Sequence, residues 1–285
     1  MEYLSELSIN SFIRLALAED ISDKDHSSEA CIKNDHQSKG VVLAKDKGII
    51  AGISLAERIL LMVSPEISIV SHKKDGEKID HGDALMTIEG NTKAILKAER
   101  LLLNCMQRMS GIATYTYYLS SLIAHTSCKL LDTRKTTPNF RIMEKWAVLI
   151  GGGHNHRFNL SDMIMLKDNH VDNAGGITQA IQKTTSYLQK NDLNLKIEIE
   201  TRDLKEVKEA VETTGVDRIM LDNFNVQTIL EALKIIPSSI ETEVSGGVNE
   251  HNIIEFAETG VDYISVGALT HSFRSLDISL KAKKL

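Results

Sequence analysis

The chain has 285 residues, of which 42% are hydrophobic and 25% charged, enough to build one large α/β domain or two smaller ones. Its formal net charge of -6 argues against general nucleic-acid binding, which needs a broad basic surface. The three cysteines, Cys31, Cys105 and Cys128, lack metal-ligand spacing and indicate free thiols in a reducing cytoplasm. The N-terminal stretch has no signal-peptide pattern, and no apolar run approaches the roughly 20 residues of a membrane span. We therefore expect a cytoplasmic protein without nucleic-acid or membrane partners.

The N-terminal third predicts an α+β module. In chain order it shows a strand-turn-strand unit, a helix, a set of hairpins and a pair of long helices, in residues 41–53, 53–63, 75–90 and 91–126. Gly76 and Gly82 fall at the hairpin turns. Ser110 and Gly111 indicate a break between the two long helices. The hairpins are also similar to a lipoyl-type carrier domain, a reading that requires a lysine at the hairpin tip.

From Cys128 onward, short apolar segments alternate with amphipathic ones. The apolar segments span residues 128–133, 162–168, 195–200, 217–223, 242–247 and 262–268. Strands alternating with helices at this pace predict right-handed βαβ units and a parallel sheet. Polar or glycine residues end every strand, which favours a barrel of the TIM type, where those ends meet at one mouth. A doubly wound open sheet is the alternative. Asn225 and Asn249 are expected to be helix N-caps.

Cations gather between Leu130 and His170, although the whole chain is acidic. Four of them lie at or near neighbouring strand ends: Arg134, Lys135, Arg157 and Lys167. Such groups repel one another unless an anion with several charges binds among them, and guanidinium groups bind carboxylates or phosphates in a bidentate manner. Alternatively, each is a solvated loop residue. His154 and His156 follow a triple-glycine turn, and one of them is expected to contact the ligand.

Two acidic residues end the next two strands. Glu200 ends KIEIE and Asp222 ends RIMLD, and Mg²⁺ bound to phosphates would take such carboxylates as hard oxygen ligands. Glu198 lies on the same strand face as Glu200, but Glu200 is preferred because it stands at the strand end. Alternatively, these carboxylates are surface or salt-bridged groups.

Glycine-rich loops follow the last two strands. They read Ser245-Gly246-Gly247 and Ser265-Val266-Gly267-Ala268. Backbone N–H groups of glycines approach phosphates closely, and barrels commonly bind phosphate after their last two strands. Plain turn glycines are the alternative for either loop. The mouth as a whole predicts two ligands, a small polycarboxylate and a phosphorylated sugar that carries Mg²⁺.

The motifs DTRKTTP, GGGHNHR, KDNH, EIE, LDN, SGGV and SVGALTHS occur in this order. Together with LAEDIS, GIIAGI, AERLLLN and RMSGIAT in the first half, they resemble the quinolinate phosphoribosyltransferase family over nearly the whole chain. DTRKTTP followed shortly by GGGHNHR carries most of the specificity. Two departures stand out: Asn139 replaces an expected glycine, and Asn91-Thr92 replaces a more usual Pro-Ala.

The resemblance implies an α/β fold with an N-terminal α+β sandwich domain over residues 1–111. An incomplete TIM-like α/β barrel would follow over residues 112–271, with residues 272–285 packing back on the first domain. The implied reaction joins quinolinate to 5-phosphoribosyl-1-pyrophosphate and gives nicotinate mononucleotide, pyrophosphate and CO2 in de novo NAD biosynthesis. The implied cofactor is Mg²⁺, and the enzyme would be a pentosyltransferase.

The resemblance also implies roles for individual residues. The quinolinate pocket would comprise Arg134, Lys135, His156, Arg157 and Lys167. The phosphates would lie against Ser245, Gly246, Gly247, Gly267 and His271. Glu200 and Asp222 would hold the ribose hydroxyls and Mg²⁺, and the catalytic set would be Lys135, Lys167, Glu200 and Asp222. Arg100 would reach in from a neighbouring subunit, which implies a homodimer and leaves a hexamer open.

Other functions compete with this interpretation. Lys167 at a strand end could form a Schiff base, as in aldolases, if neighbouring cations activated its amine. A phosphoribosyltransferase that uses nicotinate as the acceptor would need fewer cations, because nicotinate has only one carboxylate. A non-catalytic anion-binding protein would tolerate a damaged metal or phosphate site, whereas every part is present in this sequence.

Overall fold

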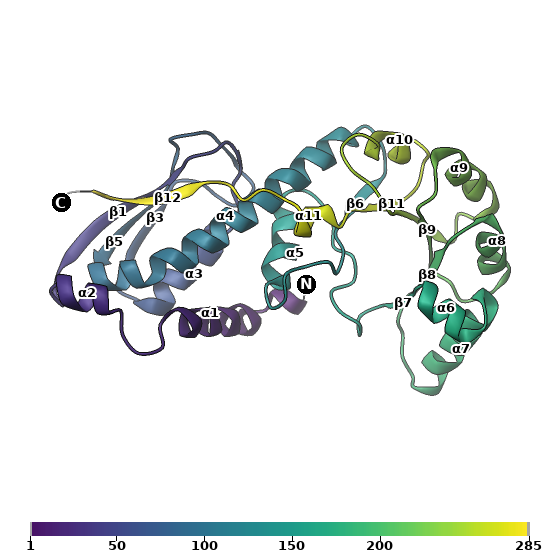
Figure 1. Cartoon of the computed structure of the whole chain (residues 1–285), viewed down its shortest axis with the longest axis horizontal. Helices are drawn as coiled ribbons and strands as arrows, with labels where there is room; N and C mark the ends of the chain where they lie inside the picture. The colour runs from purple at the N-terminus through teal and green to yellow at the C-terminus, as the bar shows by residue number, and fades with distance from the viewer. Residues whose placement is uncertain (1, 284–285) are drawn as a thin grey trace. The chain divides into compact units, whose positions relative to one another are not determined.

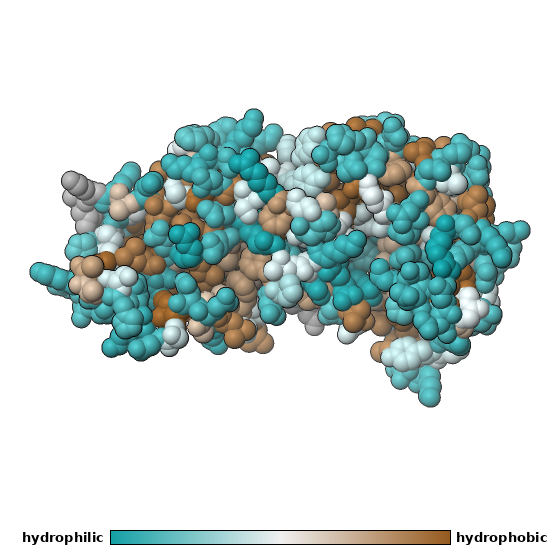
Figure 2. Space-filling model, viewed as in Figure 1, coloured by the Kyte–Doolittle hydropathy of each residue, from teal (hydrophilic) through white to brown (hydrophobic). Residues whose placement is uncertain are grey.

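The computed structural model describes residues 2–283, and the chain divides into two compact units. The first comprises Met1–Tyr117, Thr136–Gly152 and Leu269–Leu285, and the second comprises Tyr118–Lys135 and Gly153–Ala268. Figure 1 shows the elements of each unit. Within the described residues, no helix is long and apolar enough to cross a membrane. Figure 2 shows hydrophilic side chains over much of the visible face, with hydrophobic ones scattered between them.

The first unit is built on an antiparallel sheet with the strand order β12-β1-β5-β3. These strands are β1 (Gln37–Ala44), β3 (Ser68–Ser71), β5 (Ala84–Asn91) and β12 (Ile278–Lys283). A small ribbon pairs β2 (Gly48–Ile49) with β4 (Lys78–Ile79). Its helices are η1 (Glu2–Leu4), α1 (Glu6–Asp20), α2 (His26–Cys31), α3 (Ile53–Val63) and α5 (Arg141–Ile150), together with most of α4 (Thr92–Leu122). The N-terminal α+β prediction is confirmed, and both hairpin glycines, Gly76 and Gly82, have positive φ.

Helix α4 runs unbroken through 31 residues, so the predicted break near Ser110 and Gly111 is wrong. Ser110 is buried, and its hydroxyl accepts the Ala51 N–H at 3.0 Å and donates to the Ala51 carbonyl at 3.1 Å. A Cβ on Gly111 would clash with the backbone of Arg274. The serine and glycine therefore permit close packing in the middle of a helix, and their breaker signal is overridden by tertiary contacts.

The two departures from the family pattern have local explanations. Asn139 adopts a φ of 63°, in the left-handed region that asparagine tolerates better than most residues, so it can occupy a glycine position. The side chain of Asn91 accepts the N–H of Ala94 at 3.2 Å, just where α4 begins. Asparagine thus satisfies one of the free N–H groups at this helix start.

The second unit is a six-stranded parallel sheet with the order β6-β11-β10-β9-β8-β7. Its strands are β6 (Lys129–Leu131), β7 (Ile164–Leu166), β8 (Ile197–Thr201), β9 (Arg218–Asp222), β10 (Glu241–Ser245) and β11 (Tyr263–Ser265). Each strand falls within a predicted apolar segment or within one residue of it. Strands β6 and β7 end the sheet and do not pair with each other in the described chain, so the incomplete barrel is confirmed.

Helices cover the outside of this sheet. They are α6 (Asp168–Ala174), α7 (Ile177–Lys190), α8 (Leu204–Glu212), α9 (Val226–Ile235) and α10 (Ile253–Ala257), with α11 (Ala268–His271) following the last strand. Figure 1 shows α8, α9 and α10 on the outer side of the curved sheet. Asn225 is the N-cap of α9 and accepts the Thr228 N–H at 3.0 Å, as predicted. Asn249 is not an N-cap, because α10 begins later and is preceded by Asn252.

Candidate active site

The carboxyl ends of the parallel strands carry most of the predicted site residues. Because such ends share one side of a barrel, residues that follow or end these strands gather there. In the second unit this set comprises Arg134, Lys135, His156, Arg157, Lys167, Glu200, Asp222, Ser245, Gly246, Gly247 and Gly267. We call this region the mouth. Arg100 and His271 belong to the first unit.

The segment 153–157 is held along the free edge of β6. Leu131 and His154 form a parallel bridge, the His154 N–H donates to the Leu130 carbonyl at 2.8 Å, and the Asp132 N–H donates to the His154 carbonyl at 3.1 Å. The fully buried carboxylate of Asp132 accepts the His156 N–H at 2.9 Å and the Asn155 amide at 2.6 Å. Asp132 therefore fixes the segment that carries His156. It was not predicted as a site residue, although its place in DTRK was a usable signal.

Arg134 and Arg157 influence each other through their charges at this side of the mouth. Burial lowers the pKa of Arg157, and the positive charge of Arg134 lowers it further, whereas Glu198 opposes both effects. Arg157 also donates to the Met163 carbonyl at 3.4 Å. Arginine stays charged in spite of such shifts, so Arg134 and Arg157 are two like charges near enough to influence each other. A ligand with two adjacent carboxylates would offset that repulsion.

Two carboxylates and a lysine occupy the next strand ends. Lys167 Nζ lies 3.5 Å from Glu200 Oε2. Burial raises the pKa of Glu200, and the Asp222 charge adds to the rise while Lys167 opposes it. Burial likewise raises the pKa of Asp222, against the hydrogen bond from Asn223 and the charges of Lys167 and Lys135. A divalent cation would favour the charged form of both carboxylates and so oppose the rise in their pKa values. Oxygen ligands of this kind suit Mg²⁺.

The glycine loop after β10 is interlocked with the end of β9. Gly246 has a φ of 95°, and a Cβ at this position would clash with Asn223. Asn223 has a φ of 58°, donates its N–H to the Ser245 carbonyl at 2.8 Å and donates from its amide to Asp222 at 2.7 Å. A Cβ on Gly247 would meet nothing within 4 Å, so the space beside its Cα is open, while its carbonyl accepts the side-chain amides of Asn249 and Asn252 at 3.1 Å. The loop thus offers backbone groups to a ligand, and Asn223, which was not predicted, holds its shape.

A layer of polar side chains is buried below the mouth. Its two carboxylates lie two residues before Glu200 on β8 and two residues before Ser245 on β10. His156 is 8% exposed, and its Nε2 lies 2.9 Å from Glu198 Oε2 and 3.5 Å from Glu243 Oε2. Arg218 lies 2.9 Å from Glu243. Burial raises the pKa values of both Glu198 and Glu243 to about 7. We call His156, Glu198, Glu243 and Arg218 the buried polar layer. Glu198 was expected on the face of Glu200, as found, but Glu243 and Arg218 were not predicted.

Arg100 lies in α4 and lines a hollow of about 430 Å³ within the first unit. Phe12, Arg108 and Phe140 also line it, and Arg108 stacks over the Phe140 ring at 5.7 Å. His271 ends α11, and its Nδ1 lies 2.6 Å from the hydroxyl of Ser272.

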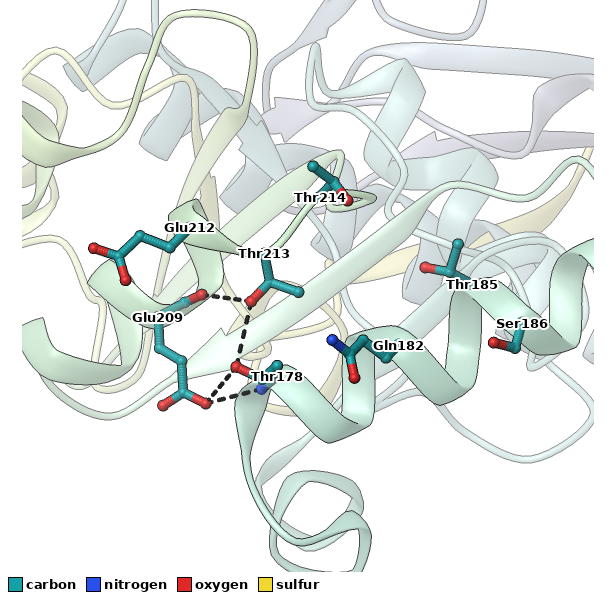
Figure 3. A pocket seen from close by; sticks show the side chains of 8 residues that line it. All are labelled: Thr178, Gln182, Thr185, Ser186, Glu209, Glu212, Thr213 and Thr214. Atoms are coloured by element: carbon teal, nitrogen blue, oxygen red, sulfur yellow. Dashed lines mark hydrogen bonds between the residues drawn. The ribbon is translucent and has the colours of Figure 1, made fainter.

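A second hollow, of about 650 Å³, lies between α7 and α8 (Figure 3). Its lining includes Thr178, Gln182, Glu209 and Thr213 and none of the predicted site residues. Thr178 donates to Glu209 through its N–H at 2.9 Å and its hydroxyl at 2.8 Å, as the dashed lines in Figure 3 show. These hydrogen bonds join the two helices that line the hollow, so its polar residues have a structural role.

Comparisons with known proteins agree over almost the whole chain. The model of the quinolinate phosphoribosyl transferase C-terminal domain matches residues 112–281, and that of the N-terminal domain matches residues 25–110. A protein of Oryza sativa subsp. japonica, named nicotinate-nucleotide pyrophosphorylase (carboxylating), chloroplastic, is 44% identical over 96% of this chain and 77% of its own length. A Bacillus subtilis protein named probable nicotinate-nucleotide pyrophosphorylase (carboxylating) is 38% identical over 97% of this chain and 94% of its own length. The crystal structure of NadC from Streptococcus pyogenes superposes with a TM-score of 0.92, at 38% identity and 99% coverage of both chains.

Proposed function

Because this chain belongs to the quinolinate phosphoribosyltransferase family, we propose that the mouth of its barrel performs the family reaction with the residues described above. The enzyme is a pentosyltransferase. It transfers the phosphoribosyl group of 5-phosphoribosyl-1-pyrophosphate to quinolinate with decarboxylation, and it forms nicotinate mononucleotide in NAD biosynthesis. The observation that carries our residue assignment is the placement of Arg134, Arg157 and Lys167 beside the ends of β6 and β7, where the charge of Arg134 lowers the pKa of Arg157.

Quinolinate is assigned to the cationic side of the mouth. Its two adjacent carboxylates would pair with Arg134 and Arg157, with Lys135 and Lys167 completing the charge balance. His156 lies beside this pocket, with both ring nitrogens directed at protein groups. This arrangement discriminates against nicotinate, which would leave one guanidinium group without a carboxylate.

The phosphoribosyl donor is assigned to the opposite side of the mouth. Ser245, Gly246, Gly247 and Gly267 would bind phosphate through backbone groups, with His271 as a further candidate. Glu200 and Asp222 would hold Mg²⁺ and the ribose hydroxyls, and the ion would neutralise the charge of the departing pyrophosphate. The charge of Asp222 raises the pKa of Glu200, and Lys167 acts on the pKa of both carboxylates, which supports this pairing.

The chemistry follows from these placements. As pyrophosphate leaves, the ribose carbon gains positive charge, which the carboxylates of Glu200 and Asp222 stabilise electrostatically. The ring nitrogen of quinolinate then attacks that carbon. The quaternary nitrogen stabilises the carbanion left when the adjacent carboxylate departs as CO2. That carbon then takes a proton from water to give nicotinate mononucleotide. Lys167 lies 3.5 Å from Glu200, which suits a binding and charge-balancing role better than a Schiff-base nucleophile.

The assembly is proposed to be a homodimer, in which Arg100 completes the site of the partner subunit. Its support is the hollow beside Arg100 in the first unit. We also place the reaction in the cytoplasm. All three cysteines are free, as suits a reducing compartment, and the Bacillus subtilis relative matches this chain over nearly its full length.

The decisive experiment follows both products. The protein is incubated with carboxyl-labelled quinolinate, 5-phosphoribosyl-1-pyrophosphate and Mg²⁺, and CO2 release is measured together with nicotinate mononucleotide. We expect equal amounts of the two products and at least a hundredfold lower rate with nicotinate as acceptor. Arg134→Ala should weaken quinolinate binding far more than donor binding. Equal losses for both substrates would contradict the placement of quinolinate.

A further inference from the structure

The buried polar layer places charged groups in the interior next to Arg157, a predicted contact of quinolinate. Glu198 and Glu243 are both 0% exposed, and the side chains of His156 and Arg218 are 5% and 12% exposed. Burying ionisable groups is expensive, and apolar side chains of similar volume often give equal or greater stability. A packing role alone therefore does not explain why carboxylates occupy the interior at this depth.

The ring of His156 has a defined orientation. Its Nδ1 accepts the backbone N–H of Arg157 at 2.7 Å, so Nδ1 carries no proton. The ring proton must then be on Nε2, which lies 2.9 Å from Glu198 Oε2. Glu198 is thus the nearer of two carboxylates that face this N–H, and Glu243 is 3.5 Å away.

We propose that Glu198 is a positioning residue for quinolinate binding, which acts through the imidazole of His156 on the backbone of Arg157. The proposal rests on the function proposed above. The carboxylate of Glu198, 2.9 Å from Nε2, favours a proton on that nitrogen and so selects the form of the ring whose Nδ1 can accept from Arg157. The backbone of Arg157 is then fixed, and its guanidinium group is directed toward the carboxylates of quinolinate. Residues that orient a primary contact in this way strongly affect affinity.

The charged neighbours of Glu198 fit this role. Glu243 lies 3.5 Å from the same Nε2 and is paired with Arg218 at 2.9 Å, while Arg218 also pairs with Glu241 at 3.0 Å. The positive charges of Arg157 and Lys167, at the mouth, lower the pKa of Glu198 and so oppose the effect of burial. The cations Arg218, Arg157 and Lys167 therefore offset the charge of the neighbouring Glu243 carboxylate and favour a charged Glu198 in the interior.

A metal ion is the main alternative occupant, because His156, Glu198 and Glu243 could together supply three ligand atoms. A neutral histidine that binds a metal through Nε2 carries its proton on Nδ1. That proton would point at the Arg157 N–H, which already occupies Nδ1. The observed hydrogen bond therefore favours the positioning role.

The first test is spectroscopic and needs no substitution at Glu198. Protein with ¹⁵N-labelled histidine is prepared, and the His156 signals are assigned by their loss in His156→Gln. We expect His156 to be the neutral form with the proton on Nε2 and an unprotonated Nδ1. A protonated Nδ1, or loss of one equivalent of tightly bound metal with a change in these signals on chelation, would overturn the proposal.

The second test compares two side chains of similar volume. Glu198→Gln keeps a polar oxygen beside Nε2, whereas Glu198→Met removes it. We expect Glu198→Met to raise the KM for quinolinate about tenfold, with less than about threefold change in kcat and in the KM for 5-phosphoribosyl-1-pyrophosphate. Glu198→Gln should recover most of the loss. Equal effects of the two variants, or equal effects on both substrates, would contradict the proposal.

A matched control comes from β10. Glu241→Gln alters another acidic partner of Arg218, but Glu241 does not face His156, so the quinolinate KM should stay within about twofold. If Glu198→Met fails to fold, the histidine spectrum and Glu198→Gln, which must keep near-normal quinolinate KM, still decide the question. Failure of the proposed function would instead show as no CO2 release by the unaltered protein.

Discussion

The carboxylate of Asp132 holds the backbone of His156 through a hydrogen bond of 2.9 Å, and this contact ties the DTRK segment to the GGGHNHR segment. Asp132→Ala leaves the His156 N–H and the Asn155 amide without their buried acceptor. We expect a loss of about 1–3 kcal/mol in the free energy of unfolding and at least a tenfold rise in the quinolinate KM. Thermal denaturation and steady-state kinetics measure the two effects.

The control for this variant is Asp262→Ala. Asp262 accepts the N–H and hydroxyl of Thr242 at 2.8 Å and 2.7 Å, at the amino end of the strands, away from the mouth. A similar loss of stability is expected there, with no change in the quinolinate KM, because the amino-terminal face of such barrels serves stability. If both variants raised the KM equally, the Asp132 contact would have no specific part in the site.

Gly246→Ala should damage the donor side of the mouth. The new Cβ would clash with Asn223 at a backbone φ of 95°, so the loop after β10 must move. We expect the KM for 5-phosphoribosyl-1-pyrophosphate to rise at least tenfold and that for quinolinate to change little. Gly260→Ala is the control, since Gly260 has a similar φ of 90° but open space around it. Unchanged donor kinetics in Gly246→Ala would remove this loop from the phosphate site.

Asp222→Asn tests the proposed metal ligands. The amide lacks the charge that Mg²⁺ prefers, so the half-saturating Mg²⁺ concentration should rise about tenfold, or turnover should cease. Activity is measured against total Mg²⁺ at fixed substrate concentrations. Asp168→Asn, which removes another carboxylate that acts on Asp222, should shift that concentration less than twofold. An unaltered magnesium dependence in Asp222→Asn would count against its assignment.

Mixed subunits test the shared site. Arg100→Ala and Arg157→Ala should each be inactive, but hybrid dimers would contain one site with both arginines intact. After unfolding and refolding together in equal amounts, about a quarter of the sites should recover. Arg134→Ala mixed with Arg157→Ala provides the control, because both residues come from the same subunit and no site is restored. Absence of recovery in the first mixture alone would place Arg100 outside the partner's site.

Glu243 should make stability depend on pH. Burial, and then the charge of Glu198, raises its pKa from 4.5 to about 7 in the folded protein. Between these values the folded state holds a proton that the unfolded state has lost, so the free energy of unfolding falls as pH rises, by at most about 1.4 kcal/mol per unit per proton. This contribution is complete below pH 4.5 and lost above about pH 7.

Glu243→Gln should therefore reduce the slope of the urea-denaturation midpoint between pH 5 and pH 8, with Glu198, whose pKa is also raised to about 7, supplying the remaining slope. Glu241→Gln should not, because Arg218 outweighs burial and lowers the pKa of Glu241, so that group titrates below this window. A wild-type slope in Glu243→Gln would mean that another group releases the proton.

Local patterns predicted the sheet, because each strand combines an apolar run with a polar end. They also favoured Glu200 over Glu198 as the residue at the mouth, because both lie on one face of β8 and Glu200 stands nearer the strand end. The roles of Asp132 and Asn223 could not be read in this way. Each depends on which segments become neighbours, namely the 153–157 segment beside β6 and the glycine loop beside β9.

Long-range contacts also explain the wrong helix break at Ser110 and Gly111. A small residue there reads locally as a helix breaker, yet Ala51 and Arg274 approach the helix closely and require small side chains. The N-cap prediction at Asn249 is wrong because of a local contact rather than a long-range one. The chain makes a turn at this position, with Asn252 Oδ1 accepting the Asn249 N–H at 2.8 Å, before α10 begins.

The bridge between Leu131 and His154 has a consequence for solubility. Strand β6 is the last strand of an open sheet, and an unpaired edge strand can recruit strands from other molecules and aggregate. The 153–157 segment covers part of that edge while it presents the substrate-binding residues. Substitutions that loosen this segment should therefore lower the yield of soluble protein along with activity, which links selection for catalysis to selection against aggregation.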